Sequence, residues 1–268
     1  MRNRSLTSNL GIYAYAGGAI FLGLLGLASG DFATQWQRVG PNVPLREPLA
    51  YLTAIIELAA GLALLWRRTA RAGALTLTAV YSVFTLLWVP SALQNLGNYD
   101  TIGNVFEEFS LVAAGLVLCA IFSPPGSSIA RRRPFFVLLF GICPISFGIV
   151  HIIDMPGLLG AIPGWLPPSR MFWAYATTLG FFGAAVAILT GILAPLASRL
   201  LTAEIVIFEL LFWIPKVFPG QRNHFNWAGN AICIAIAGAT WAVSDSICQA
   251  AKRAPAPAES ATEIGTAV

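Results

Sequence analysis

Residues 12–30 read IYAYAGGAIFLGLLGLASG, nineteen residues without a charged side chain. A helix of that length extends about 28 Å at 1.5 Å per residue, close to the ~30 Å hydrocarbon thickness of a bilayer. The stretch follows Arg2 and Arg4, as a signal peptide would, but it exceeds the usual apolar region of about 7–15 residues and no small-residue cleavage site follows. It therefore predicts a retained transmembrane helix.

Seven further apolar runs of comparable length follow along the chain. Hydrophobic residues make up 57% of the sequence and charged residues 10%, whereas soluble domains carry roughly 25% charged residues. So few charges could not cover a water-facing surface, so the apolar majority must face lipid. We predict an all-α membrane protein with eight transmembrane helices, from the first run and those at residues 48–66, 72–89, 105–122, 134–153, 171–193, 196–214 and 227–247.

The distribution of Lys and Arg predicts the orientation. With a cytoplasmic N-terminus, five basic residues fall in outer loops, namely Arg38, Arg46, Arg170, Lys216 and Arg222. Eleven fall on the inner side, namely Arg2, Arg4, Arg67, Arg68, Arg71, Arg131, Arg132, Arg133, Arg199, Lys252 and Arg253. Because eight is even, both termini are predicted to be cytoplasmic, and a bacterial inner membrane is the expected location.

The basic residues lie in short clusters between apolar runs, so the net charge of +4 indicates juxtamembrane anchors and not nucleic-acid binding. The lipid bilayer is the expected partner. The cysteines are all inside apolar runs and form no C-x-x-C pair, which is typical of small buried hydrophobic residues.

The two halves of the chain resemble each other. Leu86-Leu87-Trp88-Val89-Pro90 corresponds to Leu211-Phe212-Trp213-Ile214-Pro215, and Ala50-Tyr51 corresponds to Ala174-Tyr175, at shifts of 125 and 124 positions. Four helices per repeat predict two parallel four-helix bundles related by an axis along the membrane normal. The expected organisation is a cytoplasmic N-terminus (1–10), a first repeat (11–122), a basic linker (123–133), a second repeat (134–250) and a disordered cytoplasmic tail (251–268).

Ionisable residues within membrane spans are costly and are therefore functional candidates. Glu57, Glu107, Glu108 and Glu209 form the predicted intramembrane polar site, and Glu204 has a lower weight. No Lys or Arg lies mid-span to neutralise them, so each must be protonated, hydrogen-bonded or open to a polar cavity. One hypothesis is that they line a cavity and relay protons or bind a ligand. The alternative is that they are protonated donors of interhelical hydrogen bonds.

A second candidate site lies at the outer end of the second repeat. His151 and Asp154 are three residues apart and share a helix face, and Arg170, Arg222 and His224 lie in neighbouring outer loops. Such a loose set favours an interfacial hydrogen-bond or salt-bridge network, and we predict no metal site. No nucleotide, zinc-hydrolase or haem motif is evident, so no cofactor is predicted.

Several of these residues resemble the DoxX family of small membrane proteins. In that family a helix ending in histidine leads to a proline-containing outer loop and then to a helix with Tyr, Glu and Gly. The sequence offers Gly148 to Asp154, Ile162 to Pro168 and Trp173-Ala174-Tyr175 in its second half, and Tyr51, Glu57 and Gly61 in its first. The resemblance covers residues 11–122 and 134–247 and implies a tandem duplication of a unit that usually occurs singly.

The two units depart from the family pattern in complementary ways. The first has Glu57 but Ala28 or a neighbour in place of a histidine, whereas the second has His151 but Phe181 in place of the glutamate. A composite site shared by the two units is one consequence.

The resemblance implies a non-catalytic accessory subunit of a membrane redox system linked to quinones or thiols, with a redox protein as its partner. Two alternatives remain open. A small proton-coupled transporter would use the intramembrane carboxylates, and a quinone-acting oxidoreductase would use His151 or Asp154.

Overall fold

The computed structural model describes residues 9–33, 35–96, 99–218 and 223–253. Within these ranges the regular secondary structure is entirely helical. Seven of the described helices are long and apolar enough to cross a membrane. They are α1 (Leu10–Ser29), α2 (Arg46–Leu65), α3 (Ala70–Gln94), α4 (Tyr99–Phe122), α6 (Arg133–Ile153), α8 (Arg170–Thr190) and α10 (His224–Ala251). Their positions match seven of the eight predicted runs.

The eighth run, residues 196–214, forms three successive helical pieces. These are α9 (Ala194–Phe208), the π-helical turn η2 (Glu209–Trp213) and the 3₁₀ turn η3 (Ile214–Val217). The α-helical part has only 15 residues. Pro215 lacks an amide hydrogen, so the α-helical ladder cannot continue through it without losing a bond.

Helix α3 contains the corresponding proline and behaves differently. Pro90 lies inside α3, which continues to Gln94. The predicted end at Val89 is therefore too early, because packing of the helix outweighs the lost hydrogen bond. Two short helices were also not predicted, α5 (Ser128–Arg131) in the linker and α7 (Met155–Ala161) after α6.

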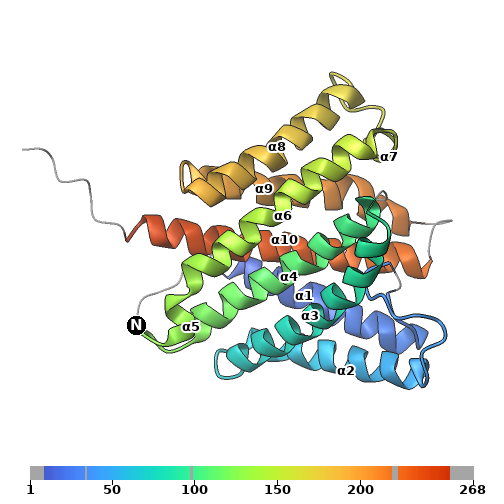
Figure 1. Ribbon diagram of the computed structural model, residues 1–268, viewed down its shortest axis with the longest axis vertical. Coiled ribbons are helices and arrows are strands. Elements are labelled where there is room, and N and C mark those ends of the chain that lie inside the picture. The colour runs from blue at the N-terminus through green and yellow to red at the C-terminus, as the bar shows by residue number, and fades with distance from the viewer. Residues whose placement is uncertain (1–8, 34, 97–98, 219–222, 254–268) are drawn as a thin grey trace, which may run out of the picture.

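The helices pack as a closed ring (Figure 1). Each long helix contacts the next one along the chain from α1 to α4, then α4 contacts α6, and α6, α8, α9 and α10 continue in order. Helix α10 packs against α1 and closes the ring, and α4 and α10 touch across it. We call α1 to α4 the N-terminal group, and α6, α8, α9 and α10 the C-terminal group. The packing order of one group therefore recurs in the other.

Small residues allow the two groups to pack closely along α1 and α10. A Cβ atom placed on Gly238 would lie 2.0 Å from the backbone nitrogen of Tyr15, and one on Gly18 would lie 2.6 Å from the backbone nitrogen of Ala235. In a bilayer the lipid tails are as apolar as the helix side chains, so the hydrophobic effect does not draw helices together. Van der Waals contact between closely packed backbones supplies the attraction instead. The glycines therefore fix the spacing at which the groups meet.

Candidate functional site

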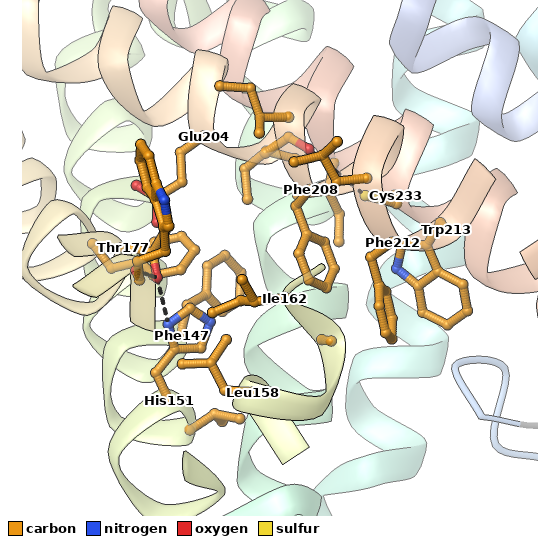
Figure 2. A pocket seen from close by; sticks show the side chains of 18 of the residues that line it. Phe147, His151, Leu158, Ile162, Thr177, Glu204, Phe208, Phe212, Trp213 and Cys233 are labelled. Carbon is orange, nitrogen blue, oxygen red and sulfur yellow. Dashed lines mark hydrogen bonds between the residues drawn. The ribbon is translucent and has the colours of Figure 1, made fainter. Parts of the chain in front are cut away.

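The C-terminal group encloses a cavity of about 570 Å³. Helices α6, α7, α8, α9 and α10 and the turn η2 supply most of its wall, and Trp36 and Glu107 reach it from the N-terminal half. Figure 2 shows the wall residues, with His151 on one side and Phe212 and Trp213 on the other. The sequence analysis did not predict this cavity.

The wall is mostly apolar and extends onto the outer surface of α9. Leu200, Ala203 and Ile207 line it, at the spacing of three or four residues that places side chains on one helix face. Leu200 is 61% exposed and Ile207 is 53% exposed. The cavity therefore opens toward an apolar outer surface of the bundle, about halfway along the helical segment formed by α9 and η2.

The π-helical turn places two aromatic rings in the wall. Trp213 packs against α10 at Gly229, where an added Cβ would lie 2.0 Å from the Trp213 ring. The Lys216 ammonium lies 3.7 Å from the centroid of the Phe212 ring. Single π turns occur often at functional sites. The sequence analysis did not anticipate the contact of Trp213 with α10.

His151 provides the polar end of the cavity. Its Nδ1 lies 3.4 Å from Thr177 Oγ1 and 3.5 Å from Thr178 Oγ1, both on α8. The edge of its ring meets Phe181, with 5.0 Å between ring centroids. The contact with Thr177 is drawn in Figure 2. A residue near the end of one membrane helix is thus oriented by a neighbouring helix.

Glu204 also lines the cavity, although the sequence analysis gave it little weight. Its Oε1 is buried without a hydrogen-bond partner in the described part of the chain. Its carboxyl group packs against α8 at Gly180, where an added Cβ would lie 2.6 Å from Glu204 Oε2. Leu200, Glu204 and Phe208 are four residues apart, and this spacing was the signal available in the sequence.

The predicted intramembrane acids do not share one site. Among them only Glu107 lines the cavity, and its Oε2 accepts a hydrogen bond of 2.8 Å from Trp36 Nε1. Glu57 lies in the N-terminal group, where Oε1 accepts a hydrogen bond of 2.7 Å from Gln37 Nε2. Glu209 is buried but is not part of the cavity wall.

Glu108 belongs to a buried polar cluster in the N-terminal group. It is 1% exposed, and within the described ranges neither carboxyl oxygen has a hydrogen-bond partner. Glu57 of α2 and Tyr81 of α3 are within electrostatic range of it. Tyr15 of α1 completes the cluster, with its hydroxyl donating to Leu111 O at 2.9 Å. Each of the four helices supplies one member of this cluster.

The loop between α1 and α2 joins the cluster to the cavity. Gln37 binds Glu57 and its neighbour Trp36 binds Glu107. Trp88 Nε1 donates to Trp36 O at 3.0 Å, and Arg46 forms an ion pair with Asp31 within the same connection. Both Trp36 and Trp88 are buried, and the indole N–H group of each binds a protein acceptor.

The predicted outer-face residues are dispersed. His151 and Asp154 both border the cavity, but Asp154 caps α7 by accepting a 3.1 Å hydrogen bond from Gly157 N. His224 Nε2 lies 3.3 Å from Ser29 Oγ, and Arg170 packs beside Gly164. Arg222 lies outside the described residues. No described group of three or more His, Cys, Asp or Glu side chains could hold a metal ion.

The chain matches no family model, no curated protein and no solved structure. Its function therefore has to be argued from the site. The residues lining the described cavity include three carboxyl groups, one imidazole and one threonine hydroxyl among mostly apolar side chains. Such a wall can enclose an apolar body and form a few directional hydrogen bonds with a polar group. The four cysteines are unpaired, and Cys233 is part of the wall.

Proposed function

We propose that this protein binds a lipid-soluble molecule in the cavity of the C-terminal group and takes it up from the bilayer. The observation that carries the proposal is the cavity of about 570 Å³, within the usual size range of small-molecule sites. Its wall is apolar apart from a few convergent polar groups, and it reaches the exposed apolar side chains Leu200 and Ile207 on α9. A ligand entering there would come from the hydrocarbon and not from water.

The topology that goes with this proposal has eight membrane crossings. The successive helical pieces α9, η2 and η3, from Ala194 to Val217, would together form the eighth crossing beside the seven apolar helices. The start of α1 and the end of α10 lie toward the same side of the bundle, at the left of Figure 1. We place that side, with the basic turns at Arg67-Arg68 and Arg131 to Arg133, in the cytoplasm.

We further propose that the chain is a duplicated DoxX-type protein that serves as an accessory subunit of a membrane redox system. The recurrence of the same packing order in both groups supports the duplication. In this view the cavity holds a lipid-soluble ligand for a partner protein that carries out the chemistry.

Photolabelling tests the binding proposal. The purified protein in lipid nanodiscs would be irradiated with a 4-alkylphenol that carries a diazirine on its alkyl chain. Labelled peptides should contain cavity residues of α6, α8 and α9, and Ala203→Phe should reduce this labelling about tenfold because the ring fills the opening. Ala79→Phe, an exposed alanine of α3, is the control. Uniform labelling of all exposed helix faces, unchanged in Ala203→Phe, would contradict the proposal.

A proton-coupled transporter is a second candidate. The favouring observation is that Glu108 lies within electrostatic range of both Glu57 and Glu107, which connects the buried cluster to the cavity wall. Proton entry into proteoliposomes under an imposed potential should exceed that of empty vesicles and fall in Glu108→Gln. Glu47→Gln, at an exposed position, should leave it unchanged. Wild-type entry no faster than in empty vesicles would end this candidate.

A further inference from the structure

The hydrogen bonds around His151 determine what kind of polar group the cavity can receive. This inference rests on the proposed function, because it concerns the ligand of the same cavity. Two threonine hydroxyls face Nδ1, and each of them also contacts a backbone carbonyl of its own helix. A hydroxyl has one hydrogen to donate but can accept from other groups. The question is therefore where the two hydroxyl hydrogens go.

Both hydrogens are used within α8. Thr177 Oγ1 donates to Trp173 O at 2.9 Å, whereas its distance to His151 Nδ1 is 3.4 Å. Thr178 Oγ1 donates to Ala174 O at 2.7 Å, whereas its distance to Nδ1 is 3.5 Å. A carbonyl oxygen can only accept, and the carbonyl contacts are the shorter ones. Toward His151 the two hydroxyls thus act as acceptors, and Nδ1 must carry the hydrogen.

The other ring nitrogen then carries only a lone pair. The imidazole is neutral here because it lies against Phe181, and neither nitrogen contacts a carboxylate among the described residues. A neutral imidazole has one N–H, so hydrogen on Nδ1 makes Nε2 an acceptor. Nε2 has no protein partner within the described ranges, and His151 is part of the cavity wall.

The indole N–H groups of two wall tryptophans are already used and do not donate to this position. Trp173, the nearest indole on α8, donates its Nε1–H to Pro167 O at 2.8 Å. Trp36 donates its Nε1–H to Glu107. Trp213 lies across the cavity from His151 in Figure 2. The unpartnered Oε1 of Glu204 is a second polar atom without a protein donor.

We propose that the cavity selects lipid-soluble alcohols or phenols, whose O–H group donates a hydrogen bond to His151 Nε2, over ligands of the same shape that can only accept. A ketone or an ether oxygen placed at Nε2 would bring two lone pairs together and leave the nitrogen desolvated without a partner. The free-energy cost of leaving a buried acceptor unpaired is larger than the net free energy gained by forming the hydrogen bond. The preference therefore comes mainly from rejection of the acceptor-only ligand.

The first test reads the tautomer directly. The chain has two histidines, so ¹⁵N-histidine labelling of the full protein with His224→Gln leaves one imidazole signal. Solid-state NMR in lipid bilayers should show a protonated Nδ1 and an unprotonated Nε2 for His151. Hydrogen on Nε2 in the ligand-free protein would overturn the inference whether or not the cavity binds a ligand.

The second test compares matched ligands. Binding of 4-nonylphenol and of its methyl ether, 4-nonylanisole, would be measured in nanodiscs, with empty nanodiscs subtracted as the partition background. We expect the phenol to bind roughly five- to tenfold more tightly. It should also shift the Nε2 resonance of His151. In His151→Phe the preference should fall to about one while binding of the ether persists.

The outcomes separate the two proposals. Equal binding of phenol and ether to the wild type would overturn the donor preference while the cavity remains a ligand site. A preference that survives in His151→Phe would also overturn it. Binding of neither compound would reject the proposed function itself, and the inference about its ligand with it.

Discussion

The two helical groups share one packing order, yet their interiors differ. In the N-terminal group, each helix contributes one side chain to a polar cluster that contains Glu57 and Glu108. In the C-terminal group, Phe181 lies 124 positions after Glu57, at the predicted repeat shift, and borders a cavity of about 570 Å³. The comparison shows that the two groups keep the same order of helix contacts while one buries a polar cluster and the other borders a cavity.

The difference depends on what holds the central side chain. Gln37 donates to Glu57 and thereby joins the loop after α1 to the interior of the N-terminal group. The ring of Phe181 packs against the rings of Phe147 and His151 and forms no hydrogen bond. Because aromatic contacts are less directional than a hydrogen bond, the C-terminal interior is less constrained.

The largest effect is expected at two glycines in close helix contacts, Gly115 of α4 and Gly238 of α10. In Gly238→Ala the new Cβ would meet the backbone of α1, and in Gly115→Ala it would meet the tip of the Thr78 side chain. A side chain can rotate away from the new Cβ, but a backbone cannot. We therefore expect the free energy of unfolding to fall by roughly 3 kcal/mol in Gly238→Ala and by about 1 kcal/mol in Gly115→Ala.

Denaturation of the detergent-solubilised protein, followed by circular dichroism, measures this difference. Gly17→Ala is the control, because an added Cβ there has no neighbour within 4 Å. Similar losses for Gly238→Ala and Gly17→Ala would show that α1 and α10 do not pack as closely as described.

The central side chains themselves provide the next test. Glu57→Leu leaves the Gln37 amide without its acceptor and should cost about 2 kcal/mol of unfolding free energy. Glu57→Gln keeps an acceptor oxygen and should cost less than half as much. Phe181 already borders the cavity, so Phe181→Leu should lower the free energy of unfolding by only about 1 kcal/mol. If Glu57→Leu and Glu57→Gln destabilise equally in the same denaturation assay, the bond from Gln37 does not support the cluster.

A smaller effect is expected where the loop joins both interiors. Trp36→Phe keeps the aromatic packing but removes the N–H that binds Glu107 at 2.8 Å. We expect the free energy of unfolding to fall by about 1.5 kcal/mol, because the buried Glu107 carboxyl group loses its hydrogen-bond donor. Trp165→Phe is the matched control, since Trp165 is 72% exposed and should change stability by less than about 0.5 kcal/mol. Equal melting temperatures for the two variants would contradict this role of Trp36.

The smallest effect concerns the polar end of the cavity. Thr177→Val removes one acceptor from His151 Nδ1 but leaves Thr178 in place. We expect little change in stability and an approximately threefold weaker binding of 4-nonylphenol, because the imidazole loses part of its orientation. The nanodisc assay measures the affinity, and Thr53→Val in α2, 124 positions before Thr177, is the control. A change of the same size in both variants would remove Thr177 from the site.

Helix positions could be predicted closely because the cause is local. Backbone groups in hydrocarbon must be satisfied within the segment, so a long apolar run becomes a helix wherever it occurs. The predicted run 134–153 and the observed helix Arg133–Ile153 differ by one residue. Helix ends at prolines were less predictable, as Pro90 and Pro215 show, because packing decides whether a lost hydrogen bond is tolerated.

The candidate site was predictable only in part. Glu107 was identified because ionisable residues in spans are costly, and His151 and Asp154 because they share a helix face at the end of a span. All three border the cavity. Glu204 was underweighted, and Glu57 was expected at the same site as Glu107. Adjacent residues on a helix point about 100° apart, so Glu107 faces the cavity while Glu108 joins the buried cluster.

The sequence by itself thus determined that the chain forms apolar helices, roughly where they lie, and which side chains would be costly to bury. These follow from segment length and composition, which each stretch of chain carries alone. Only the tertiary structure decided which helix faces meet, and so which of the costly side chains open onto a cavity. The rotation of each helix about its axis depends on close contacts such as Gly238 with Tyr15 and Gly229 with Trp213, and these join segments far apart in the sequence.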